Sequence, residues 1–419
     1  MLHAIVGNGV AGVTAARAIK QADASADVHL LSAEPYPYYR RPQLWEFIAG
    51  KVEQDALFFK PAEWYAEQGI QLHLGVKATA LDPGAHRLAL SDGAKIEYDR
   101  LLLATGGRCF VPPCQGTDKE GVFTLRSLQD ALAIKAFAEK ASQAVVIGGG
   151  LLGLETARAL QSAGLDVTVI EYFSYLLPRQ LDQPGAQVLQ SLLEAQGLHI
   201  ITSGATKEIL GNGRAQGVRI ADPHLPQGAM PGASQADEAY IPGELVIFST
   251  GIRSRIALAE QAGIQVGHGV IVDEQLRTSA EDVFAAGDAA EFEGRVYGII
   301  PAAIEQAQTA AANMVTPGSQ VYTGTIPSTT LKVAGAQLTS MGEATLPEDE
   351  CTAVRRVDME NGVYYKCALR DGHIVGAILL NAPGRVRTLA RLIKEGVDVS
   401  GYVDRLFDDD FKPDGNFIR

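Results

Sequence analysis

The chain opens with an order of apolar and glycine-rich segments that predicts a strand, a tight turn and a helix. Residues Leu2–Val6 are apolar, the sequence Gly-Asn-Gly-Val-Ala-Gly occupies positions 7–12, and an Ala-rich helix is expected to continue through Ile19. A second apolar strand, Val28–Leu31, is followed closely by Glu34. This order of elements is typical of a βαβ unit with a dinucleotide-binding turn.

The same pattern returns further along the chain. Ala144–Ile147 is apolar, Gly-Gly-Gly-Leu-Leu-Gly occupies positions 148–153, and a helix is expected to about Ser162. The next strand, Val167–Ile170, runs directly into Glu171. One such glycine pattern alone is a weak signal. Two copies between a strand and a helix, each with an acid about 20 residues on, predict two nucleotide sites.

The glycines have a physical role in such turns. The first permits the turn, the second lets the backbone approach a pyrophosphate, and the third lets the helix pack on the strand. The helix N-terminus then offers free N–H groups and a partial positive charge to the anion. The predicted cofactor-binding glycines are Gly7, Gly9 and Gly12 in the first copy and Gly148, Gly150 and Gly153 in the second.

Other predicted strands also end in small turns. The strand-rich stretch Gln71–Leu103 leads into Thr105 and Gly106, and Leu245–Phe248 leads toward Gly251.

The later part of the chain changes in character. Residues 282–288 read as a strand that ends in Gly287 and Asp288, and residues 222–239 read as an extended loop between hairpin strands. Beyond about Val315, alternating runs such as Thr330–Val333 and Val363–Leu369 predict strands, and a helix is expected over Arg385–Glu395.

Length and charge narrow the range of functions. A chain of 419 residues is expected to form two or three domains, and its net charge of −13 disfavours binding to nucleic acid or to an anionic membrane. No apolar run reaches the length that crosses a bilayer. The apolar start, Met1–Ala18, is interpreted as a buried strand and helix because it lacks a basic leader segment. The expected location is the cytosol.

Four cysteines are present, and no pair has the Cys-x-x-Cys spacing, so neither a disulfide scaffold nor a metal site is expected. Cys109 and Cys114 have the spacing of a redox pair, but the two prolines between them favour an extended backbone. Five extended steps separate Cα atoms by roughly 16 Å. A disulfide needs less than about 7 Å. The spacing is therefore interpreted as coincidental.

The order of the motifs resembles a known family. Positions 7–12, 105–106, 148–153, 250–251 and 287–288 follow the order of the FAD-dependent pyridine nucleotide-disulfide oxidoreductase superfamily. The resemblance extends over the whole chain.

Three shorter stretches narrow the resemblance. The sequences Tyr-Tyr-Arg-Arg-Pro-Gln-Leu at 38–44, Leu-Pro-Arg-Gln-Leu-Asp at 177–182 and Leu-Lys-Val-Ala-Gly at 331–335 are similar to NADH:rubredoxin oxidoreductases and to the flavoprotein part of NAD(P)H-dependent nitrite reductases. The disulfide reductases of this superfamily carry their cysteine pair on the first-domain helix. The equivalent stretch here, about 40–50, has no cysteine.

The resemblance implies an α/β fold with two Rossmann-like dinucleotide-binding domains and a smaller α+β C-terminal domain. The FAD domain would be discontinuous, over residues 1–109 and 245–316, with the NAD domain, residues 110–244, inserted in it. Residues 317–419 would form the C-terminal domain near the flavin and the acceptor site.

The resemblance also assigns residues to FAD. Glu34 would bind the adenosine ribose, and Asp288 would bind a ribityl hydroxyl. Arg41 would lie near the phosphates or the flavin, with the adjacent Arg40 as the alternative in a register shifted by one residue. A helix beginning near Pro301 and Ala302 would direct its positive end at the flavin. For Glu34 a solvated acid is the competing interpretation, since the family often places the acid where this chain has Ser32. The other cofactor-binding positions so implied are Ala78, Thr105, Gly106, Leu152 and Gly251.

On the NAD side, Glu171 would meet the adenosine ribose. Glu155, two residues after the second glycine motif, would approach the nicotinamide and flavin and act in catalysis. Relatives often pair this Glu with a lysine on the first-domain helix, where this chain has Glu46. Lys332 is the predicted substitute, and Lys60 is the alternative. A solvated surface charge is the competing interpretation of both lysines, and it is favoured for Lys60.

The implied reaction is hydride transfer from NADH to FAD, with NADPH less favoured, followed by electron transfer to a small rubredoxin-like protein. Three alternatives stay open: an electron-input component for nitrite reductase, an NADH oxidase, and a redox-sensing FAD- and NADH-binding protein. A candidate docking face for the protein partner is the helix with Arg387, Arg391 and Lys394 on one side and Arg385 at its start. A solvated helix face balanced by local acids is the competing interpretation.

Overall fold

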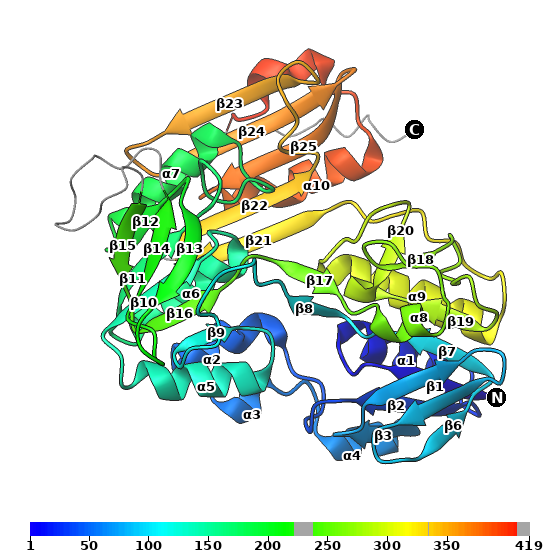
Figure 1. Ribbon diagram of the computed structural model, residues 1–419. Helices are drawn as coiled ribbons and strands as arrows, with labels where there is room; N and C mark the ends of the chain where they lie inside the picture. Colours follow the sequence, from blue (N-terminus) through cyan, green and yellow to red (C-terminus); the bar gives the residue numbers. More distant parts are fainter. Residues whose placement is uncertain (222–237, 334, 409–419) are drawn as a thin grey trace. The chain divides into compact units, whose positions relative to one another are not determined.

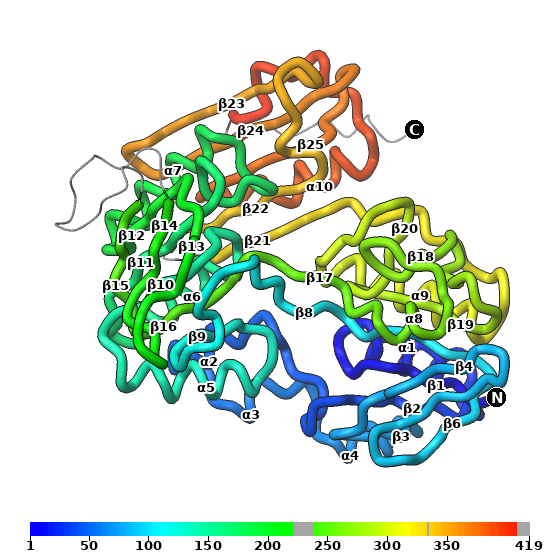
Figure 2. Tube along the Cα trace, in the orientation of Figure 1, coloured from blue at the N-terminus to red at the C-terminus, as the bar shows by residue number. Residues whose placement is uncertain are grey.

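The structure is a computed structural model that describes residues 1–221, 238–333 and 335–408. The chain divides into two compact units, and each is assembled from segments far apart in the sequence. Unit 1 comprises residues 1–47, 52–109 and 252–325, and unit 2 comprises residues 48–51, 110–251 and 326–419. Apart from the short stretch 48–51, the chain traced in Figure 2 runs from unit 1 into unit 2, back into unit 1 and again into unit 2. The finer division into FAD, NAD and C-terminal domains stays a prediction.

Unit 1 is built on a five-stranded parallel sheet (Figure 1). Its strand order is β19 (Val283–Ala285), β7 (Arg100–Leu103), β1 (Leu2–Val6), β2 (Asp27–Ser32) and β3 (Ile70–Leu74). The central strands are mostly apolar, as is typical of a parallel sheet covered on both faces; Ile5, Leu30 and Leu101 are fully buried.

Two alanine-rich helices pack together in unit 1: α1 (Val10–Ala22) and α9 (Ile300–Val315). Small residues such as Ala15 and Ala307 are fully buried, which lets the helices approach closely. The other helical elements of this unit are η1 (Arg41–Gln43), α2 (Leu44–Ile48, whose last residue belongs to unit 2), α3 (Gln54–Leu57), α4 (Ala62–Glu67), α8 (Ala257–Gln261) and η2 (Gly287–Ala289).

Three small sheets complete unit 1. The first has three strands, β4 (Ala78–Asp82), β5 (Arg87–Leu90) and β6 (Lys95–Glu97). The second pairs β8 (Gly107–Cys109) with β17 (Ile252–Ser254), and the third pairs β18 (Val270–Val272) with β20 (Ala290–Phe292).

The first half of unit 2 repeats the arrangement of unit 1. Its parallel sheet has the order β12 (His199–Ile201), β11 (Asp166–Ile170), β10 (Gln143–Ile147), β16 (Leu245–Phe248) and β9 (Val122–Thr124). Its helices are α5 (Leu128–Ala138), α6 (Leu151–Ser162) and α7 (Gln183–Glu194). Two parallel sheets of this kind, each with a glycine turn before a helix, confirm the predicted α/β class.

A three-stranded antiparallel sheet flanks the predicted surface loop. It consists of β13 (Ala205–Leu210), β14 (Gly217–Ala221) and β15 (Glu238–Pro242). The strands β14 and β15 form the hairpin predicted from the sequence. Most of the loop predicted at 222–239 lies outside the described residues.

The last part of unit 2 is an antiparallel sheet with helices. The strand order is β21 (Ser328–Val333), β22 (Ala336–Gly342), β25 (His373–Leu380), β24 (Val363–Arg370) and β23 (Thr352–Asp358). The helical elements are η3 (Pro383–Arg385), α10 (Val386–Glu395) and η4 (Ser400–Arg405). The helix predicted from Arg385 begins one residue later, because Arg385 closes the 3₁₀ turn that starts at Pro383.

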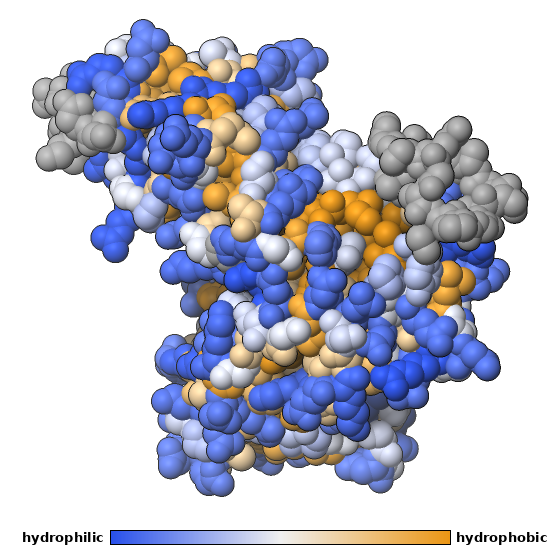
Figure 3. Space-filling view, turned by 90° about the vertical axis from the view of Figure 1, so that its left-hand side faces the viewer, coloured by the Kyte–Doolittle hydropathy of each residue, from blue (hydrophilic) through white to orange (hydrophobic). Residues whose placement is uncertain are grey.

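Hydrophilic residues cover most of the face drawn in Figure 3, with apolar residues gathered in smaller patches. Two adjacent exposed aromatics, Tyr172 and Phe173, directly follow Glu171. None of the helices among the described residues has the length and apolarity required to cross a membrane.

A buried histidine in β1 predicts acid sensitivity of unit 1. His3 is 1% exposed, and its Nδ1 atom has no hydrogen-bond partner among the described residues. Burial lowers the pKa of His3 from 6.5 to about 4. The unfolded chain therefore binds a proton between these values that the folded chain does not. The folded state is therefore most stable with respect to His3 above pH 6.5, and this stability is lost as the pH falls toward 4.

Because of His3, we expect the free energy of unfolding to fall by about 3 kcal/mol between pH 6.5 and pH 4, since a one-unit pKa shift corresponds to about 1.4 kcal/mol. Denaturant unfolding of FAD-saturated wild type and of His3→Leu across that range measures it. In His3→Leu, the free energy of unfolding should lose this dependence on pH. The control His268→Leu, at an exposed position, should keep it. Equal slopes for wild type and His3→Leu would contradict the expectation.

Candidate cofactor sites

The predicted FAD residues gather at one edge of the unit 1 sheet. Gly7 directly follows β1, Thr105 lies just beyond β7, Gly287 lies just beyond β19, and Glu34 follows β2. These strands are parallel, so their carboxyl ends meet at one edge. Ligands bind at this edge in open α/β sheets.

The first and third glycines of the first motif are required by close backbone contacts. Gly7 has a φ of +121°, and a Cβ there would lie 2.1 Å from the carbonyl oxygen of Ala104. A Cβ on Gly12 would lie 1.8 Å from the carbonyl oxygen of Gly7. Any side chain at either position would displace the turn or the helix that follows it.

A charged cluster lies against the second glycine of this motif. Arg41 donates from Nη2 to Glu34 Oε1 over 2.6 Å, and the Tyr39 hydroxyl donates to Glu34 Oε2 over 2.5 Å. The Arg41 Nη1 atom lies 3.3 Å from where a Cβ on Gly9 would be. The structure thus brings Glu34, Arg41 and the glycine turn together. Arg40 instead donates to the carbonyl of Ala56.

The residues around this turn fit a dinucleotide such as FAD. Among the described residues, Asn8 Oδ1 and Arg41 Nε are buried without hydrogen-bond partners. No side chain caps the first turn of α1, so its N–H groups remain available to an outside acceptor. Buried polar groups without partners are costly, and a bound pyrophosphate and ribose would supply acceptors and donors. Asn8 was not predicted from the sequence, where it is only a variable position between two glycines.

Beside β19, the predicted ribityl-binding turn is held by a residue that the sequence did not single out. Gly287 has a φ of +77°, and a Cβ there would lie 3.0 Å from the Cβ of Ala11 in α1. The Gly287 amide donates to Gln306 Oε1 over 2.9 Å. Gln306 is almost fully buried in α9. In the sequence, the role of Gln306 was indicated only by its being a polar residue within an alanine-rich, buried helix.

The remaining predicted FAD positions lie on several elements. Asp288 is half-buried in η2, Thr105 donates to the carbonyl of Arg255 over 2.8 Å, and Ala78 is buried at the start of β4. Pro301 lies in the first turn of α9, and no side chain caps that turn. The roles of these residues toward FAD stay predictions.

The second glycine motif in unit 2 reproduces the geometry of the first. Gly148 has a φ of +115°, and a Cβ there would lie 2.3 Å from the carbonyl oxygen of Ser249. A Cβ on Gly153 would lie 2.0 Å from the carbonyl oxygen of Gly148. Glu171 and Gly251 follow β11 and β16 at the same edge, because these strands are parallel to β10.

Glu171 is directed at this turn. It is 6% exposed, its Oε2 accepts from the Gly149 amide over 2.7 Å, and its Oε1 accepts from the Phe173 amide over 2.9 Å. Burial raises the pKa of Glu171 above its usual value. Each carboxylate oxygen has a further lone pair for a ribose hydroxyl.

The second motif contains one glycine that the protein itself does not require. Gly150 is the N-cap of α6, its φ of −77° suits any residue, and a Cβ there would meet nothing within 4 Å. Open space above this position is what a close-lying pyrophosphate needs.

We therefore expect Gly150→Ala to fold and bind FAD normally while the KM for NADH rises about ten-fold or more, or about 1.4 kcal/mol. Steady-state kinetics and flavin content measure the two effects. Gly401→Ala, at another open glycine, is the matched control and should leave KM unchanged. An unchanged KM in Gly150→Ala would argue against a nucleotide at this turn.

The two predicted catalytic residues lie on elements that pack together. Glu155 is half-buried on α6, and Lys332 is exposed on β21, a strand that contacts α6. Leu152 is half-buried in the first turn of α6. Lys60 is exposed, with its ammonium 6.0 Å from the centre of the Phe59 ring. The catalytic roles of Glu155 and Lys332 stay predictions.

None of the four cysteines is part of a disulfide. Burial raises the pKa of Cys114 and raises that of Cys367 to about 12, so both thiols stay protonated at neutral pH. Among the described residues, no cluster of three or more His, Cys, Asp or Glu side chains is arranged to hold a metal ion.

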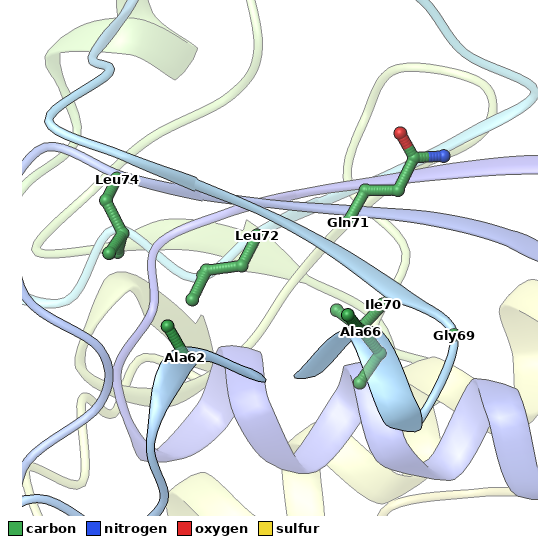
Figure 4. A pocket seen from close by; sticks show the side chains of 7 residues that line it. All are labelled: Ala62, Ala66, Gly69, Ile70, Gln71, Leu72 and Leu74. Atoms are coloured by element: carbon green, nitrogen blue, oxygen red, sulfur yellow. The ribbon is translucent and has the colours of Figure 1, made fainter. Parts of the chain in front are cut away.

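A surface hollow lies away from the predicted site residues (Figure 4). Leu72 and Leu74 of β3 point toward the side of Ala62 in α4, whereas Gln71 points the opposite way. This alternation is that of an ordinary strand under a helix. None of the predicted cofactor residues lines the hollow, so the glycine turns define the candidate sites.

Two glycine turns of one geometry, each at the carboxyl edge of a parallel sheet, define a flavin- and pyridine nucleotide-dependent oxidoreductase. Residues 1–313 match the pyridine nucleotide-disulphide oxidoreductase family, and residues 327–397 match the rubredoxin NAD+ reductase C-terminal domain. The chain belongs to the pyridine nucleotide-disulphide oxidoreductase family.

Relatives with different acceptors resemble the chain. It is 34% identical to a nitrite reductase [NAD(P)H] of Bacillus subtilis, over 94% of this chain and 47% of that protein. It is 29% identical to an NADH-rubredoxin oxidoreductase of Clostridium acetobutylicum, over 96% of each chain. The chain thus spans about half the length of the nitrite reductase.

Among solved structures, the chain is similar to a covalent putidaredoxin reductase–putidaredoxin complex. The TM-score is 0.84 with 26% identity, over 97% of this chain and 96% of the matched one.

Proposed function

We propose that this protein takes hydride from NADH through bound FAD and passes the electrons to a small one-electron carrier protein. The observation that carries the proposal is the repeated turn geometry. In both turns the first glycine lies under a neighbouring carbonyl oxygen, at 2.1 and 2.3 Å from its would-be Cβ, and the third packs on the first, at 2.0 Å or less. Two nucleotides on one chain are what a flavin reductase needs.

FAD supplies the chemistry when bound, because it accepts a hydride and can release electrons one at a time. The protein's residues bind and orient. Arg41 and the N-terminus of α1 neutralise pyrophosphate charge, and Asp288 accepts from a ribityl hydroxyl. The uncapped first turn of α9 stabilises negative charge nearby. Glu171 accepts from the ribose hydroxyls of NADH.

The electrons leave without a thiol relay. None of the four cysteines is part of a disulfide, and burial keeps two of them protonated. We expect a variant with all four cysteines replaced by Ser or Ala, if folded with FAD, to keep nearly all of its NADH-to-dye electron transfer. Stopped-flow flavin reduction and steady-state dye reduction test this. Loss of flavin reduction in a folded, flavin-loaded variant would overturn the non-thiol mechanism.

The proposed partner is a rubredoxin-like or ferredoxin-like protein. The rubredoxin relative and the putidaredoxin complex are each named for such a carrier. These carriers are usually acidic, and the net charge here is −13, so docking requires a local basic surface. We define the α10 basic face as Arg387, Arg391 and Lys394, three exposed residues at helical spacing.

A second candidate function is electron input to a nitrite reductase. It is favoured by the 34% identity to the Bacillus subtilis enzyme, of which this chain spans 47%. The deciding experiment is steady-state NADH oxidation by the FAD-loaded protein with rubredoxin, ferredoxin, nitrite reductase subunits or oxygen as the acceptor. Fast turnover with a one-electron carrier supports the proposal. Fast turnover with oxygen alone would refute it.

A further inference from the structure

Residues 176–182 of unit 2 connect the second glycine turn to the five-stranded sheet of β21 to β25, which we call the C-terminal sheet. At the turn, the Leu177 amide donates to the Gly149 carbonyl over 3.3 Å. A Cβ on Gly149 would lie 2.5 Å from Leu176 Cδ2, so the segment packs directly against the turn. The other side of Gly149 is held by Glu171, which accepts from its amide. The turn is therefore held between Glu171 and the segment 176–182.

The segment is rigid in physical terms. Leu176, Leu177 and Leu181 are fully buried. Leu177 has a φ of +55°, a left-handed conformation that costs a non-glycine residue on the order of 1 kcal/mol or more. Its carbonyl accepts from the amides of Gln180 and Leu181 over 2.8 and 2.9 Å. A strained, fully buried position persists only where the surroundings over-determine it.

The segment ends at Asp182, which caps helix α7 and also contacts the C-terminal sheet. Asp182 is the N-cap of α7, where its Oδ1 accepts from the Gly185 amide over 3.3 Å. Its Oδ2 accepts from the Tyr364 hydroxyl over 2.7 Å and pairs with Lys366 Nζ at 3.4 Å and Arg355 Nε at 3.3 Å. Tyr364 and Lys366 are on β24, and Arg355 is on β23.

These contacts are buried and closely packed. Tyr364 is 0% exposed and Lys366 is 1% exposed. A Cβ on Gly185 would lie 2.9 Å from the Tyr364 ring, so the first turn of α7 lies flat on that ring. Burial and the hydrogen bond to Asp182 raise the pKa of Tyr364, so its hydroxyl remains a donor at neutral pH. A lysine this buried depends on its carboxylate partner.

We propose that Asp182, Tyr364 and Lys366 are positioning residues through which the C-terminal sheet holds the NADH-binding turn in its binding geometry. The proposal rests on the proposed assignment of the second glycine turn to NADH. None of the three contacts that turn directly. Their effect passes through the segment 176–182, whose other end is bonded to Gly149.

The coupling has a thermodynamic consequence. If docking of β24 on Asp182 favours the binding geometry of the turn, weakening it lowers affinity for the nucleotide. By reciprocity, the nucleotide then strengthens the docking of β24 by the same factor. FAD binding is unaffected, because the FAD residues belong to unit 1.

The test compares two neighbouring tyrosines on β24. Tyr364→Phe removes the hydroxyl that donates to Asp182 but keeps the ring. Tyr365→Phe is the matched control, because Tyr365 packs instead on Phe407 and Arg385. NAD+ affinity is measured by titration calorimetry on FAD-loaded protein. We expect the dissociation constant of Tyr364→Phe to rise about five-fold or more. Tyr365→Phe should match wild type, and both should keep full FAD content.

A second variant and a reciprocal measurement support the comparison. Asp182→Asn keeps an N-cap but removes the charge that pairs with Lys366, and it should also weaken NAD+ binding. In wild type, NAD+ should slow amide hydrogen exchange in β24. Equal NAD+ affinity in wild type and Tyr364→Phe would overturn the coupling. Absence of NAD+ binding to wild type would instead overturn the proposed function.

Discussion

NADH should support turnover about 100-fold or more better than NADPH, judged by kcat/KM. The NADPH 2′-phosphate would lie beside the Glu171 carboxylate. Two like charges about 4 Å apart repel by up to about 4 kcal/mol at an effective dielectric near 20. Glu171 is 6% exposed, so solvent screens this repulsion less than it would at the surface.

The Glu171 carboxylate is held against the second glycine turn. Its two oxygens accept from the Gly149 and Phe173 amides, which fix the carboxylate against the turn. Because burial raises the pKa of Glu171, the carboxyl becomes protonated at a higher pH than usual as the solution is acidified. The preference for NADH should therefore shrink as the pH falls, as the repelling charge is lost.

Glu171→Gln is the sharp test of this prediction. The amide oxygen can still accept from Gly149, but the charge is gone. We expect kcat/KM for NADPH to rise and that for NADH to fall modestly, with the ratio no longer dependent on pH. Equal kcat/KM values for the two nucleotides in the wild type would refute the role of Glu171.

The backbone of both sites follows from sequence pattern. Apolar strands before Gly7 and Gly148 and helices after Gly12 and Gly153 leave few ways to fold, because the third glycine must pack on the first. Parallel pairing then brings the carboxyl ends of β1, β7 and β19 to one edge. The sequence pattern was therefore enough to predict that each glycine turn lies between a strand and a helix.

Side-chain partners at these sites could not be predicted in the same way. Whether Arg40 or Arg41 lies near the turn depends on the 3₁₀ turn at 41–43, whose register local sequence does not specify. Gln306 reaches Gly287 because α9 packs on η2. Asp182 and Tyr364 are 182 positions apart and meet through the packing of α7 on the C-terminal sheet. Such contacts are tertiary and leave no local pattern.

Reversing the charge of the α10 basic face should slow electron transfer to an acidic carrier protein by about ten-fold or more at low salt. The structure narrows the face predicted from the sequence. Arg385 donates to the carbonyls of Leu406 and Phe407, so it is engaged with the segment that directly follows η4. Arg387 and Lys394 are exposed, and the contact of Arg391 with Glu395, at 4.0 Å, is solvent-exposed. Exposed ion pairs of this kind contribute little, so the three charges remain available to a partner.

Arg387→Glu combined with Arg391→Glu lowers the net charge by four. The control, Lys95→Glu with Lys140→Glu, makes the same change at exposed lysines elsewhere. Steering by a local face raises the association rate by about ten- to a thousand-fold. It weakens with salt, as the Debye length falls from about 10 Å at 0.1 M to about 3 Å at 1 M. The α10 variant should thus lose rate with the protein acceptor at low salt, keep its rate with a neutral dye, and approach wild type at 1 M salt. Equal losses in the two variants would mean that overall charge governs docking, and no loss in the α10 variant would place the docking surface elsewhere on the protein.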